Sequence, residues 1–147
     1  MKSKTTVLRS RAHILIAEDD GAVAKIVAQA VREIGFRTHW AKDGVKAINW
    51  IFLEKPTAVI LDLTLPRLDG AEICSLVRKT QEVRNTPIIV LSGHADTDDK
   101  LRMFELGADD YVTKPFSVAE LVARLDAVLK RSLYLRPHML FTASVGR

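Results

Sequence analysis

The chain has 147 residues, 48% of them hydrophobic and 27% charged, which fits one globular domain and excludes a disordered chain. One cysteine, no apolar run of about 18 residues and no signal peptide indicate a cytoplasmic protein without disulfides or a membrane segment. Residues 1–13 and 130–147 each carry four basic residues and no acid, leaving 14 basic against 18 acidic residues between them, which argues against direct nucleic-acid binding.

The first half of the chain contains two strand–helix units. The apolar run HILIA at 13–17 predicts a strand buried on both faces, and helical spacing of apolar residues follows it as far as Gly35, which ends that helix. RTHWA at 37–41 predicts a weaker strand, after which Asp43 opens a second helix that Pro56 stops. The apolar residues expected on the inner faces of these two helices are Val23, Ile26, Val27, Ala30, Val31, Ile34, Val45, Ile48, Ile51 and Phe52.

Three further units follow. The runs AVIL at 58–61 and IIVL at 88–91 predict two more buried strands, and Asp69 opens the helix between them. A fourth helix precedes a short fifth strand at 111–113, and Ser117 caps the final helix. The apolar residues that mark these three helices are Ile73, Leu76, Val77, Leu101, Phe104, Val118, Leu121, Val122, Leu125, Val128 and Leu129.

Alternating buried strands and amphipathic helices predict an α/β fold, a doubly wound (βα)5 parallel sheet covered by helices on both faces. We assign this domain to residues 13–131. Residues 1–12 form a basic N-terminal tail, and residues 132–147 form a basic C-terminal tail or a truncated linker. The C-terminal segment is too short for a second domain.

Polar residues follow four of the predicted strands. In open α/β sheets, ligands bind beyond the carboxyl ends of the strands, so these residues are expected at one rim. They are Glu18, Asp19 and Asp20 after the first strand, Asp62 after the third, Ser92 after the fourth and Lys114 after the fifth. Taken singly, each has an ordinary explanation: Asp20 suits a helix cap, and Lys114 suits a solvated lysine. Chance is a poor explanation for all of them together.

The rim residues suit one chemistry. Clustered carboxylates repel one another unless a cation neutralises them, and all-oxygen ligands favour Mg²⁺ or Mn²⁺ over zinc. A central carboxylate such as Asp62 is a competent nucleophile toward phosphorus. Lys114 and Ser92 could share the charge and hydrogen bonds of the phosphoryl oxygens with the metal.

Four motifs carry a resemblance to a known family. They are ILIAEDD (14–20), VILDLTLPRLDG (59–70), PIIVLSGHAD (87–96) and GADDYVTKPFSVAELVARL (107–125). Their order and spacing resemble the CheY-like receiver domain of response regulators over about residues 14–131. The resemblance implies a flavodoxin-like fold with strand order 2-1-3-4-5.

The resemblance also implies roles at the reaction site. Asp62 matches the aspartate that is phosphorylated, and Lys114 matches the lysine that contacts the phosphoryl group. Glu18 and Asp19 match the acidic pair that binds Mg²⁺ together with Asp62. The backbone carbonyl of Thr64 matches the remaining protein ligand of the metal.

Further residues match positions that transmit or time the signal. Ser92 and Tyr111 match the switch pair, in which the aromatic ring turns inward when the hydroxyl moves to the phosphoryl group. Thr64 and His94 fall where side chains modulate dephosphorylation. The bond between Lys114 and Pro115 is typically cis in this family.

The last stretch resembles the OmpR/PhoB-like branch of transcription factors. There, the fourth helix, fifth strand and fifth helix form a symmetric dimer face with ion pairs between chains. The residues at comparable places are Lys100, Asp109, Asp110, Glu120 and Arg124. The alternative is that these are solvated surface charges of little energetic value. A DNA-binding domain of that branch does not fit in this chain, which leaves a fragment, a stand-alone receiver or a basic tail that docks elsewhere.

The sequence therefore predicts a signalling switch that receives its phosphoryl group from a histidine kinase or a phosphotransfer protein. It predicts no enzyme beyond self-catalysed phosphotransfer and autodephosphorylation. One alternative is a small aspartyl-phosphate phosphatase of the haloacid-dehalogenase type, which needs two acids at DxD spacing, whereas Leu63 and Thr64 follow Asp62. The other is a binding scaffold, which would lack one of the site residues.

Overall fold

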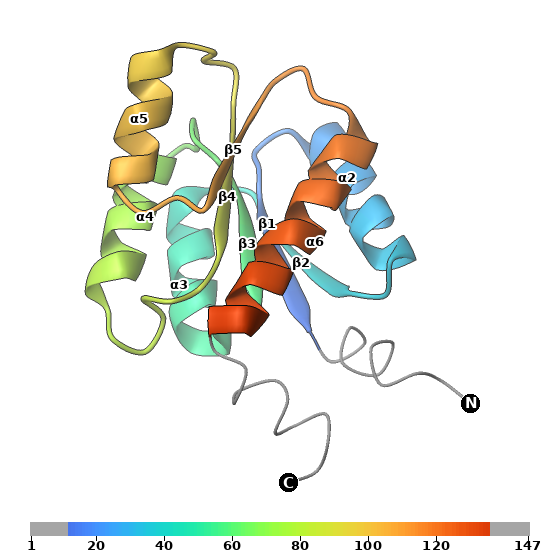
Figure 1. Ribbon diagram of the computed structural model, residues 1–147, viewed down its shortest axis with the longest axis horizontal. Coiled ribbons are helices and arrows are strands. Elements are labelled where there is room, and N and C mark those ends of the chain that lie inside the picture. Colours follow the sequence, from blue (N-terminus) through green and yellow to red (C-terminus); the bar gives the residue numbers. More distant parts are fainter. Residues whose placement is uncertain (1–11, 136–147) are drawn as a thin grey trace, which may run out of the picture.

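The computed structural model describes residues 12–135, so most of the predicted tails 1–12 and 132–147 lies outside the described residues. Its centre is a five-stranded parallel sheet in the order β2-β1-β3-β4-β5, which confirms the predicted fold class (Figure 1). The strands are β1 (His13–Ala17), β2 (Arg37–Ala41), β3 (Ala58–Asp62), β4 (Ile88–Ser92) and β5 (Asp110–Thr113). The helices are α2 (Gly21–Glu33), α3 (Gly44–Glu54), α4 (Gly70–Lys79), α5 (Thr97–Glu105) and α6 (Val118–Leu135). Helix α6 thus runs past residue 131, the predicted end of the domain.

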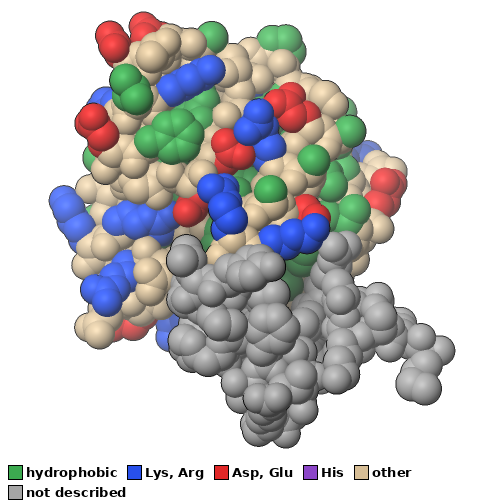
Figure 2. Space-filling view, viewed as in Figure 1, with side chains coloured by type: hydrophobic (Ala, Val, Ile, Leu, Met, Phe, Trp, Pro, Cys, Tyr) green, Lys and Arg blue, Asp and Glu red, His purple; other side chains and the backbone are tan. Residues whose placement is uncertain are grey.

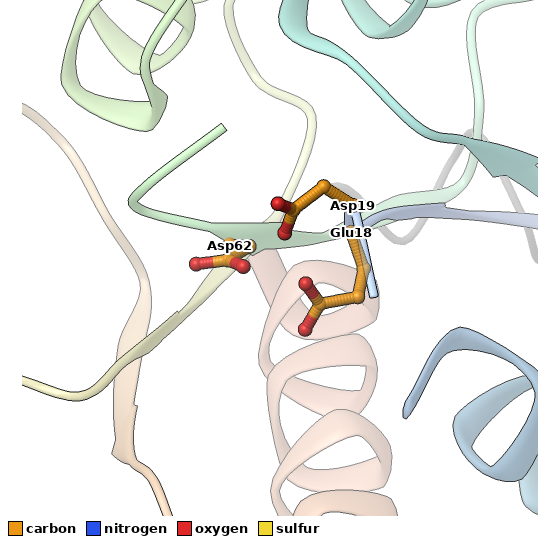
Figure 3. A group of neighbouring side chains, drawn as sticks. All are labelled: Glu18, Asp19 and Asp62. Carbon is orange, nitrogen blue, oxygen red and sulfur yellow. The ribbon is translucent and has the colours of Figure 1, made fainter. Parts of the chain in front are cut away.

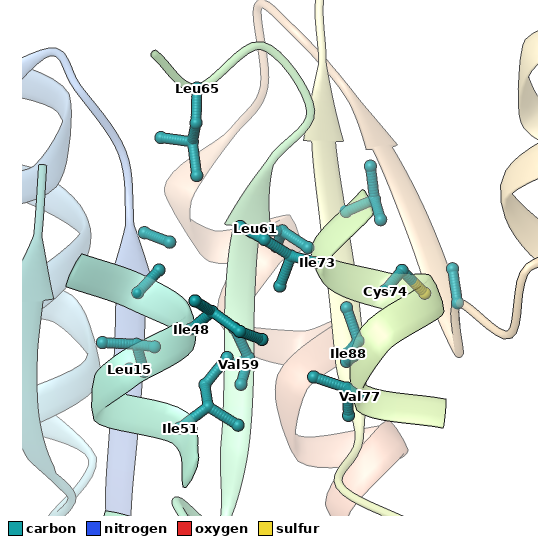
Figure 4. Packing of buried hydrophobic residues seen from close by; sticks show 14 of the residues in the cluster. Leu15, Ile48, Ile51, Val59, Leu61, Leu65, Ile73, Cys74, Val77 and Ile88 are labelled. Carbon is teal, nitrogen blue, oxygen red and sulfur yellow. The ribbon is translucent and has the colours of Figure 1, made fainter. Parts of the chain in front are cut away.

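The sheet separates two apolar layers, because successive side chains of a strand point to opposite faces. In β1, Ile14 and Ile16 pack with α2 and α6, while Leu15 and Ala17 pack with α3 and α4. Figure 4 shows the second layer, in which side chains of α3 and α4 meet those of β1, β3 and β4. Every residue of β3 and β4 is buried, as expected for strands covered on both sides.

Aspartates begin the helices that lead away from the functional rim. The side chain of Asp20 accepts hydrogen bonds from two N–H groups in the first turn of α2, and Asp43 and Asp69 cap α3 and α4. The hydroxyl of Ser117 accepts from the Glu120 N–H at the start of α6, as predicted. Gly35 follows α2 with a φ of 102°, a conformation that favours glycine.

The predicted inner faces of the helices are only partly confirmed. Several large residues that the spacing placed on the apolar stripes are more than a third exposed: Ile26, Phe52, Leu76, Leu101 and Phe104. Smaller or unbranched residues take the inner positions instead, including Ala24, Ala28 and Ala47, and Met103 in α5. A helix that lies close to a sheet buries a narrow stripe, so large residues at the stripe's edge stay in solvent. Within residues 12–135, no helix is long and apolar enough to cross a membrane.

Candidate functional site

The structure brings together three of the predicted acids at the carboxyl ends of two adjacent strands. Glu18 and Asp19 directly follow β1, and Asp62 is the last residue of β3 (Figure 3). One carboxylate oxygen from each lies within 4.8 Å of the other two. Glu18 and Asp62 are buried, whereas Asp19 is exposed, so the cluster opens to solvent on the Asp19 side.

Lys114 joins this cluster from the end of β5. Its ammonium nitrogen lies 2.8 Å from Oε1 of Glu18 and 3.1 Å from Oδ2 of Asp62. The Lys114 N–H donates to the carbonyl of Ser92 at 2.6 Å, which fixes the backbone from which the side chain reaches the cluster. The Lys114–Pro115 bond is cis, as the resemblance implies. A single ammonium group therefore pairs with the two buried carboxylates of the cluster.

Thr64 holds the other oxygen of Asp62. Its backbone N–H donates to Oδ1 of Asp62 at 3.0 Å, and its hydroxyl donates to the same oxygen at 3.2 Å. Since Lys114 binds Oδ2, donors fix both oxygens and orient the carboxylate. The metal-binding role of the Thr64 carbonyl stays a prediction.

The two buried carboxyl groups titrate differently. Burial, followed by hydrogen bonding to the neighbouring Asp62 carboxylate, raises the pKa of Glu18 to about 7, against the lowering effect of Lys114. Burial by itself would raise the pKa of Asp62. Hydrogen bonds from Glu18, Thr64 and Lys114 outweigh burial and hold that pKa below its usual value. Asp62 is thus a carboxylate at neutral pH, whereas Glu18 has a pKa of about 7.

The donor set fits a hard divalent cation. The cluster offers carboxylate oxygens only, from Glu18, Asp19 and Asp62, and carries more negative charge than Lys114 can balance. Mg²⁺ prefers such oxygen ligands and usually combines one or two carboxylates with waters and a substrate phosphate.

The predicted switch residues lie on the neighbouring strands. Ser92 is buried at the end of β4, and its hydroxyl oxygen accepts the His94 N–H at 3.0 Å. Tyr111 is buried, and its hydroxyl donates to the His94 carbonyl at 2.7 Å. The His94 imidazole is largely exposed and lies 3.8 Å from the Asp99 carboxylate. A single backbone unit, His94, thus connects the two predicted switch side chains.

The charges expected on the dimer face pair within the chain. Arg124 contacts Asp110 and Glu120, each at 3.1 Å. Lys100 lies 5.8 Å above the Tyr111 ring. Asp109 is bound by Arg78, a contact that the sequence did not indicate, because a basic residue near a helix end is usually solvated. The sequence also gave no sign that the indole of Trp40 binds the backbone of Glu18.

A family model for the response regulator receiver domain matches residues 14–126. The chain belongs to this family. Its curated relatives include the "Probable transcriptional regulator ycf27" of Guillardia theta, 42% identical over 85% of the chain and 48% of the relative. "Response regulator MprA" of Mycobacterium sp. (strain KMS) is 39% identical over 81% of the chain and 51% of the relative. The receiver domain therefore spans about half the length of the curated relatives it matches.

Solved structures agree with this assignment. The receiver domain of the Francisella response regulator 1452 has a TM-score of 0.78 at 35% identity, covering 83% of this chain and 99% of that one. The receiver domain of a signal transduction histidine kinase from Syntrophus aciditrophicus has a TM-score of 0.75 at 30% identity, covering 81% and 90%. The predicted resemblance to receiver domains close to the OmpR/PhoB-like branch is confirmed.

Proposed function

We propose that this receiver domain accepts a phosphoryl group on Asp62 from a sensor histidine kinase or a phosphotransfer protein in the cytoplasm. The observation that carries the proposal is the ionised Asp62 carboxylate, held by Thr64 and Lys114 beside two further acids at an open rim. Membership of the receiver family favours this switch over a haloacid-dehalogenase-type phosphatase or a scaffold. We propose no enzyme activity beyond self-catalysed phosphotransfer and autodephosphorylation.

The transfer step uses residues of this chain. An oxygen of Asp62 attacks phosphorus, a P–O bond forms, the P–N bond of the phosphohistidine breaks, and its electron pair stays on the imidazole nitrogen. Lys114, already 3.1 Å from Asp62, is placed to contact a phosphoryl oxygen, and the Ser92 hydroxyl can bind another. Thr64 keeps the attacking carboxylate oriented.

Mg²⁺, or Mn²⁺ in its place, would be held by Glu18, Asp19 and Asp62, with the backbone carbonyl of Thr64 as a further ligand. The cation would neutralise charge on the phosphoryl oxygens during transfer. Thr64 and His94 are proposed to modulate dephosphorylation, because Thr64 binds the Asp62 carboxylate and His94 binds the neighbouring Ser92 hydroxyl.

The signal is proposed to leave through Ser92 and Tyr111. A phosphoryl group on Asp62 would draw the Ser92 hydroxyl away from the His94 N–H that it now accepts. His94 also holds the Tyr111 hydroxyl through its carbonyl, so a change at Ser92 would reach β5 through a single residue. Tyr111 is already buried in the unphosphorylated chain. Phosphorylation would therefore change the hydrogen-bond partner of its hydroxyl and would not move the ring from the surface to the interior.

The output face is proposed to be α5, β5 and α6, which forms a homodimer. Figure 2 shows this side of the molecule, where acidic and basic side chains alternate around apolar ones. The charged residues are Lys100, Asp109, Asp110, Glu120 and Arg124, and the exposed apolar residues include Leu101 and Phe104. Exchange of the intrachain ion pairs for pairs between two copies would close a symmetric interface. Transcriptional control would follow through a DNA-binding domain, as the relatives' names suggest.

Phosphorylation can be tested with acetyl phosphate and Mg²⁺, followed by intact-mass measurement. We expect one added phosphoryl group on the unmodified chain and none on Asp62→Ala. Asp126→Asn, which changes an acid of α6 away from the rim, is the matched control and should gain the group normally. Turnover of an external phosphoester, with no mass gain, would instead support the phosphatase.

Dimerisation can be tested by sedimentation with and without beryllofluoride and Mg²⁺. We expect a monomer that becomes a dimer on addition, and a weaker dimer for Arg124→Glu, which reverses a charge on the proposed face. A monomer under both conditions would remove the dimer from the proposal and leave phosphorylation unaffected.

A further inference from the structure

Trp40 makes an unusual contact with the acidic loop. It lies in the edge strand β2, opposite Ile16 of β1, and its indole N–H donates to the backbone carbonyl of Glu18 at 2.6 Å. The ring also covers the start of α2, since a Cβ built on Gly21 would lie 3.5 Å from it. Yet Trp40 is 47% exposed, so burial alone does not account for its position.

The carbonyl that Trp40 binds belongs to the peptide joining Glu18 to Asp19. A peptide unit is planar, so an anchored carbonyl fixes the plane and with it the directions of the two flanking Cα atoms. The adjacent N–H of Glu18 is anchored as well, through a 3.0 Å bond to the carbonyl of Ala41. The end of β2 therefore sets the backbone from which both acids project.

Asp19 depends on this anchoring more than Glu18 does. The Glu18 carboxylate is held by Lys114 and by the N–H of Asp20. Among residues 12–135, no hydrogen bond to the Asp19 carboxylate is found, and the side chain is exposed. Its backbone is held through the anchored Glu18–Asp19 peptide, which fixes the direction of the Asp19 Cα–Cβ bond.

We propose that Trp40 is a positioning residue that presets the Glu18–Asp19 pair for the divalent cation without touching the cation. This inference rests on the proposed metal-dependent phosphotransfer. Pre-organised ligands lose less freedom on binding, so the indole raises cation affinity. Phenylalanine at position 40 would keep an aromatic ring at this site, although it lacks the far indole carbons that lie near Gly21. It could not donate, and the freed carbonyl would turn toward water.

The test compares Trp40→Phe with Trp50→Phe by calorimetric titration with Mg²⁺. Loss of one positioning hydrogen bond should raise the Kd for Mg²⁺ about threefold to tenfold in Trp40→Phe. The matched control is Trp50, whose ring stacks on that of His39 with 4.5 Å between the centroids and which makes no contact with the acidic cluster. Trp50→Phe should leave the Kd unchanged. Because the chain has two tryptophans, Trp50→Phe also leaves Trp40 as the sole tryptophan, whose emission should change on Mg²⁺ addition.

Two readouts separate positioning from general stability. Amide hydrogen exchange at Glu18, whose N–H donates to the Ala41 carbonyl, should quicken in metal-free Trp40→Phe, and the phosphorylation rate should recover at saturating Mg²⁺. A lowered Tm with an unchanged Kd would overturn the inference, because it would mean a purely structural role. No Mg²⁺ binding by the unmodified chain would overturn the proposed function and the inference together, whereas equal binding by both variants would overturn the inference alone.

Discussion

Two polar clusters lie at opposite ends of the same sheet, and their charges are balanced to different degrees. At the amino ends of β4 and β5, the Arg78 guanidinium donates to the carbonyls of Arg84, Thr86 and Gly107 at 2.7–2.9 Å and pairs with Asp109 at 2.9 Å. Asp109 in turn accepts the N–H of Ile88 at 2.7 Å. We call these contacts the Arg78 node.

Gly107 is part of the node's construction. Its φ is 103°, and a Cβ built there would lie 2.7 Å from Nε of Arg78. Only glycine therefore allows the guanidinium to reach the turn before β5. The node is a closed set in which the positive charge has a carboxylate and three carbonyls.

The rim at the carboxyl ends is left unbalanced. Glu18 and Asp62 share one lysine, Asp19 adds a third carboxylate to the cluster, and the pKa of Glu18 rises to about 7. Paired charges thus stabilise the fold at one end of the sheet, whereas carboxylates at the other end repel one another. Functional sites commonly carry such a cost in stability, which a bound cation would remove.

The largest expected effect comes from breaking the node. Arg78→Met should lower the free energy of unfolding by about 2–4 kcal/mol, because three carbonyls and the Asp109 carboxylate lose their donor. Urea unfolding measures this, with Arg84→Met as the control, since only the backbone of Arg84 takes part. The Kd for Mg²⁺ should stay the same. A change in that Kd would mean that the two clusters are coupled.

Removing a charge at the rim is expected to raise the free energy of unfolding. Glu18→Gln should stabilise the metal-free protein at pH 8 by about 1–3 kcal/mol, because it removes a buried charge whose pKa is raised. The sign follows from linkage: a carboxyl whose folded pKa of about 7 exceeds the ordinary 4.5 contributes stability below pH 4.5 and loses it as pH rises to about 7. Urea unfolding in EDTA at pH 5 and pH 8 should therefore show the gain at pH 8 alone. Destabilisation at pH 8 would contradict the idea that the ionised Glu18 carboxylate costs stability in the metal-free protein.

Cation binding should itself depend on pH. Below pH 7 the Glu18 proton must leave before the carboxylate can bind Mg²⁺, so the Kd should rise about tenfold between pH 8 and pH 6. Calorimetry in two buffers of different ionisation enthalpy would detect the released proton. Glu18→Gln should bind weakly with a flat pH profile, and an equally steep profile in this variant would assign the proton to another group.

The smallest effect is expected for an exposed pair. Lys130 and Asp126 form an i,i+4 ion pair at 3.0 Å on α6, with the lysine largely in solvent. Lys130→Gln should change the free energy of unfolding by less than about 0.5 kcal/mol, because water and salt screen such pairs. Thermal unfolding checks this. A larger loss of unfolding free energy would show that solvent exposure does not identify the ion pairs that contribute little to stability in this domain.

Much of the fold could be predicted from local signals. Short β-branched runs such as HILIA marked strands because buried parallel strands are apolar throughout, and aspartates marked helix starts because their side chains cap free N–H groups. The inner faces of the helices were harder. Ile26 and Phe104 fit the apolar periodicity yet face solvent, since periodicity gives a direction and not the width of the contact with the sheet.

The candidate site divides in the same way. The sequence by itself determined which residues follow the strands, so Asp62, Lys114 and Ser92 could be placed at one rim from chain order alone. The hydrogen bond from Trp40 to the Glu18 carbonyl and the ion pair between Arg78 and Asp109 became visible only in the tertiary structure. Their partners lie 22 and 31 residues apart in the sequence. Strand ends are set by local apolar patterns, whereas hydrogen bonds between distant segments depend on how those segments pack, and no local pattern records that.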